Sequence, residues 1–475
     1  MTSNSYIKHL PNELLAKIFS AVEDGHQDLV WKLPSPALIS SVCRHWQMLA
    51  QNTPTLWINI LVPVHKSLED CKRWITEWIA RSGVLLISVI LNDSMGNHWI
   101  WPHLSNIIDV LSPHSKRIRR IAIHSHFHTL ASSALVNSLL PQLPSAPNLE
   151  QLTICSGNGS SLIQESPGQR QYSLDFPKLT TLKAEGLMVP FFSNLTSLSI
   201  RKLSVSYRAV SHLFTTSPGL KHLTLHDLMP LTTLPPPLDL IRADSLRSLA
   251  VSLLWRHLPE QPTYLFKYLA MPNIKYLELD GDAWKASDFG QSLSSAQIDT
   301  LYISNRSEQS PDTINFLHSF STVRHLQLVH ASTRGLLTKR ARSLVRRTSV
   351  NLRPNAPIDS YNINAIQLKP PITVSVNAWP EVRTITLVTL TAGDMVNLCA
   401  FVTCHKHVQV VELSTSARRH LSSSLRRRGD TVYQRFSLFK AVGSEEGLND
   451  VEAWLKKMVD IRVLRSPSVG LLHAD

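Results

Sequence analysis

Histidine and cysteine provide the few candidates for metal chemistry in this sequence. The motif Cys399-x-x-x-x-Cys404-His405-x-His407 offers thiolate and imidazole ligands for zinc, but its spacing differs from that of the common structural zinc sites. The alternative is a helix end that runs into a strand at Val408 and leaves the histidines exposed. The motif His124-x-His126-x-His128 has no acidic residue or cysteine nearby, which favours a plain surface location. We therefore expect no metal site and no cofactor.

Other arrangements typical of enzymes are missing from the sequence. Glycine is scarce, at 16 of 475 residues, and Gly157-x-Gly159 lacks the remaining positions of a phosphate-binding loop. The sequence contains neither a G-x-S-x-G elbow nor a cysteine–histidine pair at a recognisable spacing. We expect a chain that catalyses no reaction itself, so its function must be sought in binding.

Composition indicates a folded protein of a reducing compartment. A hydrophobic content of 43% supports a sizeable core, and the five cysteines are odd in number and scattered. The sequence holds no apolar run of the length that spans a bilayer, and its start lacks the basic and apolar regions of a signal peptide. We expect a cytoplasmic or nuclear protein with no membrane partner.

The net charge of +13 is concentrated in three basic clusters, at residues 116–120, 339–347 and 426–428. Nucleic-acid binding is one interpretation and a solvated surface is the other. The clusters lie far apart and none alternates with aromatic residues, as a base-stacking platform would. We therefore do not expect nucleic acid as the partner, although 339–347 could serve as a localisation signal or bind an acidic partner.

The elements with the clearest apolar spacing lie near the start of the chain. Pro11 suits the first position of a helix, and Glu13 suits its first turn. Apolar residues then recur at helical spacing at Leu14, Leu15, Ile18, Phe19 and Val22. A second such face begins at Pro36, ends at Thr53-Pro54, and includes Leu38, Ile39, Val42, Trp46, Leu49 and Ala50. Two or three short helices cannot bury this much apolar surface among themselves, so part of it requires a partner.

These residues carry a family resemblance. The pattern Leu10-Pro11-x-Glu13-Leu14-Leu15-x-x-Ile18-Phe19, followed by Val42-Cys43-Arg44-x-Trp46-x-x-Leu49-Ala50 and Pro54-x-Leu56-Trp57, resembles an F-box. With the repetitive remainder, the chain is similar to the fungal group of F-box proteins with leucine-rich repeats. It departs from the pattern in an insert at 23–35, which lengthens the loop between the helices.

The resemblance implies a bridging role. The F-box would bind a Skp-type adaptor and, through it, a cullin–RING ubiquitin ligase core, while the rest of the chain binds an unknown protein target. Several adaptor-binding residues must also hold the F-box together. The residues that the resemblance assigns to adaptor binding are Leu10, Pro11, Leu14, Ile18, Phe19, Val42, Cys43, Trp46 and Leu49.

Beyond residue 80 the unit apolar-x-x-apolar-x-apolar recurs. Its central residues from Leu198 to Leu326 are spaced by 25, 26, 28, 24 and 25 residues, within the range of leucine-rich repeats. Many units follow a turn of Pro and a polar residue, which would start a short strand. The spacing fails between Leu182 and Leu198, at 16 residues, and between Leu326 and Ile385, at 59. We interpret the longer gap as one degenerate repeat with an inserted loop.

The predicted fold is a small helical F-box followed by an irregular leucine-rich-repeat solenoid of α/β repeats, shaped as an arc or horseshoe. Its domains would be the F-box at 4–60, a helical connector at 61–83 with helical spacing at 68–79, and the repeats at 84–430. The first buried strand would be 84–91, the irregular insert 331–380, and the C-terminal cap 431–475 with a closing helix at 451–459.

Strand alternation predicts which repeat residues face a target. These target-facing residues are His222, Thr224, Tyr276, Glu278, Thr300, Tyr302, His325 and Gln327. The predicted function is a substrate receptor of an SCF-type ligase. Two alternatives stay open: an F-box protein that acts as a ligase-independent interaction scaffold, and a basic nucleic-acid-associated binder.

Overall fold

The computed structural model describes residues 10–24, 35–62, 67–93, 100–125, 146–156, 176–185, 192–201, 207–228, 240–253, 264–281, 284, 289, 293, 296–304, 311–329, 379–388, 398, 401–402, 407–414 and 458–463. The chain divides into two units. Unit 1 comprises Met1–Ile274, Asp288–Ala296 and Val469–Asp475, and unit 2 comprises Lys275–Ser287 and Gln297–Ser468.

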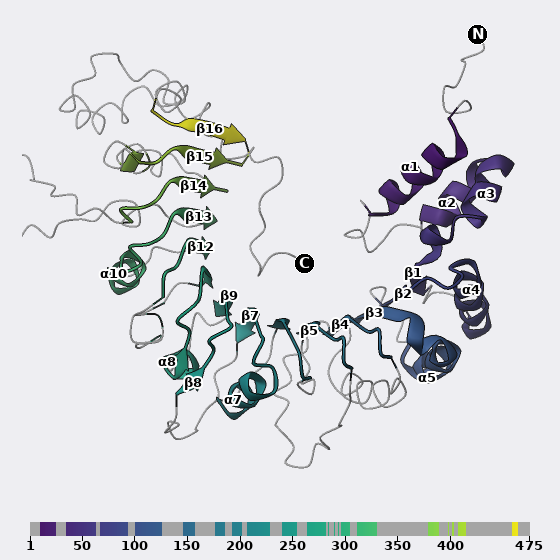
Figure 1. Ribbon diagram of the computed structural model, residues 1–475, viewed down its shortest axis with the longest axis horizontal. Coiled ribbons are helices and arrows are strands. Elements are labelled where there is room, and N and C mark those ends of the chain that lie inside the picture. Colours follow the sequence, from purple (N-terminus) through teal and green to yellow (C-terminus); the bar gives the residue numbers. More distant parts are fainter. Residues whose placement is uncertain are drawn as a thin grey trace, which may run out of the picture. The chain divides into compact units, whose positions relative to one another are not determined.

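The N-terminal helices form where the apolar spacing predicts them (Figure 1). Helix α1 (Asn12–Asp24) follows Pro11, whose carbonyl accepts hydrogen bonds from the amides of Leu14 and Leu15 at 3.0 and 3.1 Å. The second predicted face is divided into α2 (Ser35–Val42) and α3 (Arg44–Gln51). Between them Cys43 has an extended backbone, and its Sγ accepts a hydrogen bond from the Trp46 amide at 3.5 Å. A 3-10 helix, η2 (Pro54–Trp57), follows.

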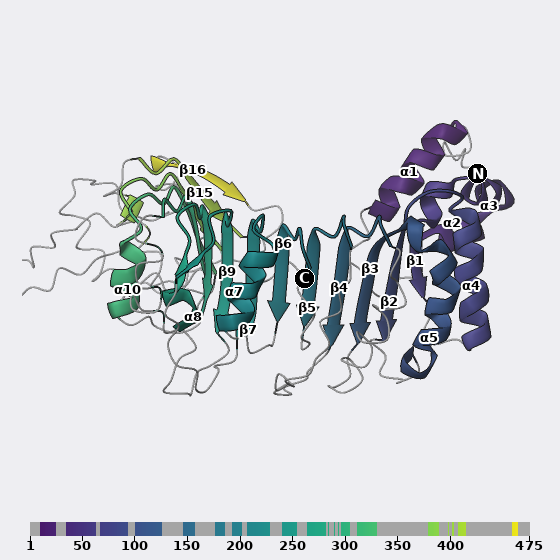
Figure 2. The same cartoon turned by 60° about the horizontal axis from the view of Figure 1, so that its bottom comes forward.

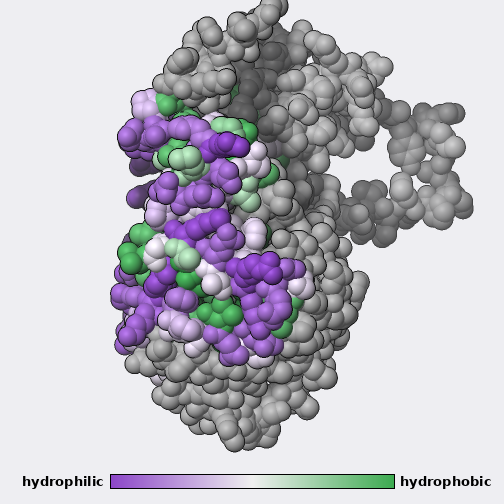
Figure 3. Space-filling model, turned by 90° about the vertical axis from the view of Figure 1, so that its right-hand side faces the viewer, coloured by the Kyte–Doolittle hydropathy of each residue, from purple (hydrophilic) through white to green (hydrophobic). Residues whose placement is uncertain are grey.

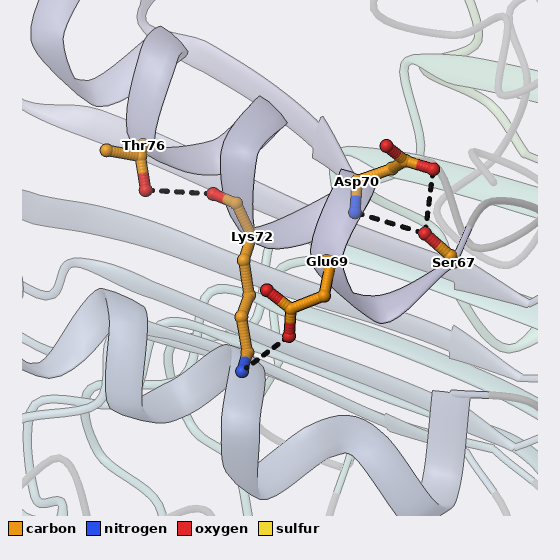
Figure 4. A network of polar contacts seen from close by, with 5 residues as sticks. All are labelled: Ser67, Glu69, Asp70, Lys72 and Thr76. Atoms are coloured by element: carbon orange, nitrogen blue, oxygen red, sulfur yellow. Dashed lines mark hydrogen bonds and ion pairs between the residues drawn. The ribbon is translucent and has the colours of Figure 1, made fainter.

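Helix α4 (Leu68–Arg81) confirms the helix predicted from the spacing at 68–79. Its N-terminus is capped by Ser67, whose Oγ accepts the Asp70 amide at 3.2 Å and donates to the Asp70 carboxylate at 2.7 Å (Figure 4). Lys72 pairs with Glu69 at 3.2 Å, and the Thr76 hydroxyl donates to the Lys72 carbonyl at 2.8 Å. The cap and the acidic first turn satisfy free amides and suit the positive end of the helix dipole.

Eight described strands of unit 1 form a parallel sheet (Figures 1 and 2). In sheet order they are β1 (Asn59–Val62), β2 (Ile87–Asp93), β3 (Ile118–Ser125), β4 (Gln151–Ser156), β5 (Thr181–Glu185), β6 (Ser197–Arg201), β7 (His222–Leu228) and β9 (Ser248–Leu253). The register places the central residues of successive repeats side by side, with Leu182 opposite Leu198 and Leu198 opposite Leu223. The strands predicted from the repeats in this unit are therefore confirmed.

The sheet starts one strand earlier than expected. Strand β1 pairs with β2, Ile60 lying opposite Val89, so residues assigned to the end of the F-box and the start of the helical connector form the first strand. The run at 84–91 is not one buried strand, because Val84 and Leu86 are exposed and β2 begins only at Ile87. Residues 82–86 instead form the turn that ends α4, in which Gly83 has φ 61°, so the strand begins only after this turn.

A hydrogen-bonded turn precedes most of the described strands of unit 1. The amide of its fourth residue donates to the carbonyl of its first, as from Leu149 to Ala146 at 3.1 Å and from Leu220 to Ser217 at 3.2 Å. Proline occupies the second position in several of these turns, where its fixed φ is suitable. Neighbouring turns are also joined, since the Asn273 side chain donates to the Asp244 carbonyl at 2.9 Å. These contacts confirm the predicted turns.

Helices cover one side of the unit 1 sheet (Figures 1 and 2). They are α4, α5 (Ile100–Leu111), α7 (Tyr207–Thr216) and α8 (Tyr264–Lys267), together with the 3-10 helix η3 (Ser112–Arg117) and the short parallel pair of β8 (Ile241–Arg242) and β10 (Leu269–Ala270). Their buried residues, such as Ile107 and Leu213, form a core with the apolar rows of the strands. Among the described residues, no helix has the length and apolarity needed to cross a bilayer.

Unit 2 contains a second run of parallel strands. They are β11 (Tyr276–Asp280), β12 (Thr300–Ser304), β13 (His325–Val329), β14 (Thr384–Leu387), β15 (Val410–Leu413) and β16 (Asp460–Val463), and α10 (Pro311–His318) connects β12 with β13. The 59-residue gap between Leu326 and Ile385 was interpreted as one degenerate repeat, but it adds no strand to the sheet between its neighbours. Strand β13 pairs directly with β14, Leu326 lying opposite Ile385, and leaves no place for a strand between them.

The C-terminal part of unit 2 differs from the expected cap. Most of the helix expected at 451–459 lies outside the described residues, as does the insert at 331–380 apart from its last two positions. Strand β16 was not predicted, yet it pairs with β15 and so continues the sheet. Its sequence Asp-Ile-Arg-Val is short and half charged, which is why the repeat pattern does not reveal it.

Candidate functional site

The N-terminal helices separate their apolar residues into two sets. One set is interior: Leu15 and Phe19 are each 2% exposed, and Ala50 and Leu56 are fully buried. Phe19 packs against Trp46, with 4.9 Å between ring centroids, and this contact joins α1 to α3. This first set stabilises the helices against one another.

The second set is exposed to solvent. On α1, Leu14 and Ile18 are 46% and 47% exposed, and on α2, Leu38 and Val42 are 47% and 60% exposed. Met48 on α3 is 63% exposed. Residues four apart share a helix face, so α1 and α2 each present an apolar stripe. Figure 3 views this side of the molecule, where green apolar surface emerges in patches among hydrophilic surface. Such exposure is typical of a surface that binds another protein.

The structure distributes the nine residues assigned to adaptor binding across both sets. Leu14, Ile18 and Val42 are exposed, as are Pro11 and Cys43. Leu10, Trp46 and Leu49 are half-buried, and Phe19 lies in the interior. Leu38 and Met48 are also exposed but are not among these nine residues, although the four-residue spacing of Leu38 and Val42 is a usable signal.

Three tryptophans, Trp57, Trp74 and Trp78, form a cluster that connects the N-terminal helices to the sheet. Trp57, at the end of η2, donates from Nε1 to the Ala50 carbonyl at 2.7 Å and meets Trp78 of α4 edge-on at 5.0 Å. Trp74 donates to the Leu61 carbonyl of β1 at 3.1 Å, and the Arg81 guanidinium lies 4.3 Å from the centre of the Trp57 ring. The exposed apolar stripes therefore belong to a body that is continuous with the first strand and with α4.

Arg117, within the first basic cluster, has a structural role at the C-terminus of α4. Its guanidinium donates to the carbonyls of Leu85 and Ile79 at 2.9 and 3.4 Å and to the buried Ser82 hydroxyl at 2.6 Å. A cation at a helix C-terminus also suits the helix dipole. Burial lowers the pKa of Arg117. Part of the basic cluster at 116–120 therefore stabilises the fold. The other two basic clusters, at 339–347 and 426–428, lie outside the described residues.

We expect replacement of Arg117 by alanine to lower the free energy of unfolding by about 2 kcal/mol, because three hydrogen bonds from a charged donor are lost. Arg117→Lys should recover only part of this, since a point charge cannot reach three acceptors. Arg119→Ala is the matched control: its exposed ion pair with Glu150 at 2.8 Å should contribute at most about 1 kcal/mol. Urea unfolding followed by circular dichroism measures all three; equal losses for Arg117→Ala and Arg119→Ala would contradict this role.

His114 lies beside this arginine, and burial, followed by the charge of Arg117, lowers its pKa below the usual 6.5. Above about pH 6.5 the histidine is neutral in the folded and the unfolded chain and adds no pH dependence. As the pH falls from there to the lowered pKa, the unfolded chain binds the proton first, so stability decreases. We expect His114→Gln to reduce this loss between pH 7 and pH 5.5 in thermal unfolding scans. Identical pH dependence in the two proteins would contradict the shift.

The predicted target-facing residues occupy the expected strand positions. Tyr276, Thr300 and His325 form one row of unit 2, and the adjacent row holds Glu278, Tyr302 and Gln327. Their exposure varies, since His325 is exposed but Glu278 is fully buried and Tyr302 is 1% exposed. The Tyr276 hydroxyl donates to Glu278 at 2.9 Å. In unit 1, His222 is exposed and Thr224 is buried.

The metal candidates are only partly described. His124 lies on β3 opposite Cys155, whereas His126 and His128 fall outside the described residues. Of the cysteine–histidine motif near residue 400, only His407 is described. The described part of the chain holds no group of three histidine, cysteine or acidic side chains that could bind a metal ion.

Comparison with known families identifies the N-terminal segment. The F-box-like family model matches residues 7–62, a range that spans α1, α2, α3, η2 and β1. No curated protein matches this chain. The chain thus carries an F-box-like domain, followed by a body of helices and parallel strands. F-box domains typically bind Skp-type adaptors.

Proposed function

We propose that this chain is the substrate receptor of an SCF-type cullin–RING ubiquitin ligase. The observation that carries the proposal is the set of exposed aliphatic side chains on the F-box-like domain, above all Leu14, Ile18 and Val42. Full burial of such a side chain from water contributes about 1.5–3 kcal/mol, and about half of its surface is still exposed here, so each of the three would add about 1 kcal/mol to an interface. A Skp-type adaptor is the partner that the domain class suggests.

The body would then act as the target-binding part, with both units built as a leucine-rich-repeat solenoid. Supporting this are the strand spacing of 24–28 residues from Leu198 to Leu326, the recurring turns and the aligned apolar rows. The chain would carry out no chemical step. Its contribution would be to hold a target lysine near the ubiquitin-loaded enzyme and so to raise the effective concentration of the target.

The tryptophan cluster supports a receptor in which one part binds the adaptor and another binds the target. A receptor must hold its target at a usable position relative to the adaptor, and a flexible joint would spread the target over many orientations. Contacts of Trp57 with Trp78 and of Trp74 with β1 restrict that joint.

Copurification from proteasome-inhibited cells tests the proposal. Tagged wild-type chain should recover a Skp-type adaptor and a cullin, whereas Leu14→Asp/Val42→Asp should recover neither but should keep its targets. Point variants are preferable to deletion of the N-terminal residues, because deletion would remove Trp57 and β1 and damage the body itself. Recovery of the adaptor without a cullin would instead favour the ligase-independent scaffold.

A further inference from the structure

The sheet face of unit 1 opposite its helices is rich in cations. Between the buried apolar rows of β3 to β7, the described side chains of this face include Arg120, Lys183 and Arg201, with Glu185 as the one carboxylate among them. Glu185 lies 3.8 Å from Arg201, which offsets its charge. Most other positions carry serine, threonine or histidine. We name this surface the basic face of unit 1.

The corresponding face of unit 2 has the opposite balance. Its described rows hold Glu278, Asp280, Glu412 and Asp460 together with Arg462. The excess positive charge on the basic face of unit 1 therefore does not simply repeat the composition of the whole protein.

Arg120 provides the sharpest indication of what this face binds. Its register neighbours are Ser88 on β2 and Gln151 on β4, neither of which is acidic. Its Nε is buried and finds no hydrogen-bond partner among the described residues. Arg120 as a whole is half-buried, so a partner would meet the outer part of its guanidinium rather than the buried Nε, and a carboxylate is the strongest acceptor that a protein partner offers to it.

We propose that the basic face of unit 1 binds an extended, acidic segment of a partner protein, rich in aspartate or glutamate. The inference rests on the proposed function, because a substrate receptor requires such a partner. From Arg120 to Arg201 the face runs diagonally over three strand spacings and four residues, roughly 20 Å, which about six extended residues would span. Serine and threonine along the path can hydrogen-bond a peptide backbone at little cost in side-chain entropy.

Nucleic acid fits this face less well. The described positions between the apolar rows of β3 to β7 carry no tryptophan, tyrosine or phenylalanine on which bases could stack.

Fluorescence anisotropy with the full-length chain tests the proposal. The probes are labelled 12-residue peptides: alternating glutamate and serine, alternating lysine and serine, and alternating phosphoserine and serine, plus a 12-nucleotide RNA. At physiological salt the glutamate peptide should bind the wild type and the lysine peptide should not. Arg120→Gln/Lys183→Gln should weaken binding at least about tenfold. The control Arg242→Gln/Arg462→Gln removes the same charge elsewhere and should change affinity less than about twofold.

Several results would overturn the proposal. These are no binding of the glutamate peptide, equal weakening by the two double variants, binding of only the phosphoserine peptide, or tighter binding of the RNA. A photo-crosslinker in the glutamate peptide should label β3 to β7, and labelling confined to 339–347 or 426–428 would also contradict it. Melting temperature and adaptor capture are recorded on the same samples. If the wild-type chain captures the adaptor but does not bind the glutamate peptide, only this inference is refuted. If the wild-type chain does not capture the adaptor, the proposed function is refuted.

Discussion

Replacement of Leu14 and Val42 by aspartate is expected to abolish capture of a Skp-type adaptor, with at least about a hundredfold loss of affinity. That loss corresponds to about 3 kcal/mol, a modest value for two central interface residues. The affinity falls because each aspartate would bury a charge against an apolar partner surface. Leu14 and Val42 are 46% and 60% exposed in the chain alone, so the free energy of unfolding should fall by no more than about 1 kcal/mol. Isothermal titration calorimetry measures the affinity, and urea unfolding measures the stability.

The matched control is Val84→Asp/Leu86→Asp. These two aliphatic residues are also exposed, but they lie in the turn after α4 and not on α1, α2 or α3. The control adds the same charge to the same kind of side chain and should leave adaptor affinity within about twofold of the wild type. If both double variants lose binding equally, or if Leu14→Asp/Val42→Asp keeps wild-type affinity, the assigned face is wrong.

Replacement of Trp57 by alanine is expected to be the most destabilising single change among those considered, at about 3–5 kcal/mol. The indole is 2% exposed and would leave a cavity beside Trp78. The change also removes the hydrogen bond to the Ala50 carbonyl and the cation–π contact of Arg81. Chemical unfolding followed by far-UV circular dichroism measures the loss.

Two related variants separate the contributions. Trp57→Phe keeps an aromatic ring but loses the hydrogen bond, so it should cost less than alanine. Trp74→Ala should also cost less, because Trp74 is only half-buried. A loss below about 1 kcal/mol for Trp57→Ala would show that the cluster does not stabilise the junction.

Much of the fold is predictable because the signals are local. Helical spacing at Leu14, Leu15, Ile18 and Phe19 predicts α1, and the repeating leucines predict strands such as β6 and β7. Each of these elements buries one regular apolar face, which appears directly as periodicity.

What the sequence does not reveal depends on contacts between distant residues. Helical spacing places Leu14, Ile18 and Phe19 within one broad apolar surface of α1, and the packing of Phe19 on Trp46 shows which part of it is interior while Leu14 stays exposed. Strand β16 forms because β15 offers it a free edge, although its own sequence is half charged. Arg117 belongs to a basic run in the sequence, and only the fold brings it to the end of α4.

Hydrogen–deuterium exchange on the wild-type chain, with and without a purified Skp-type adaptor, shows whether the exposed apolar side chains of the F-box-like domain form the adaptor-binding surface. We expect the adaptor to slow exchange in α1, α2 and α3, the helices that carry Leu14, Ile18, Val42 and Met48, and to leave exchange in the strands of both units unchanged. Unchanged exchange in these helices at saturating adaptor, or protection confined to the strands, would contradict it.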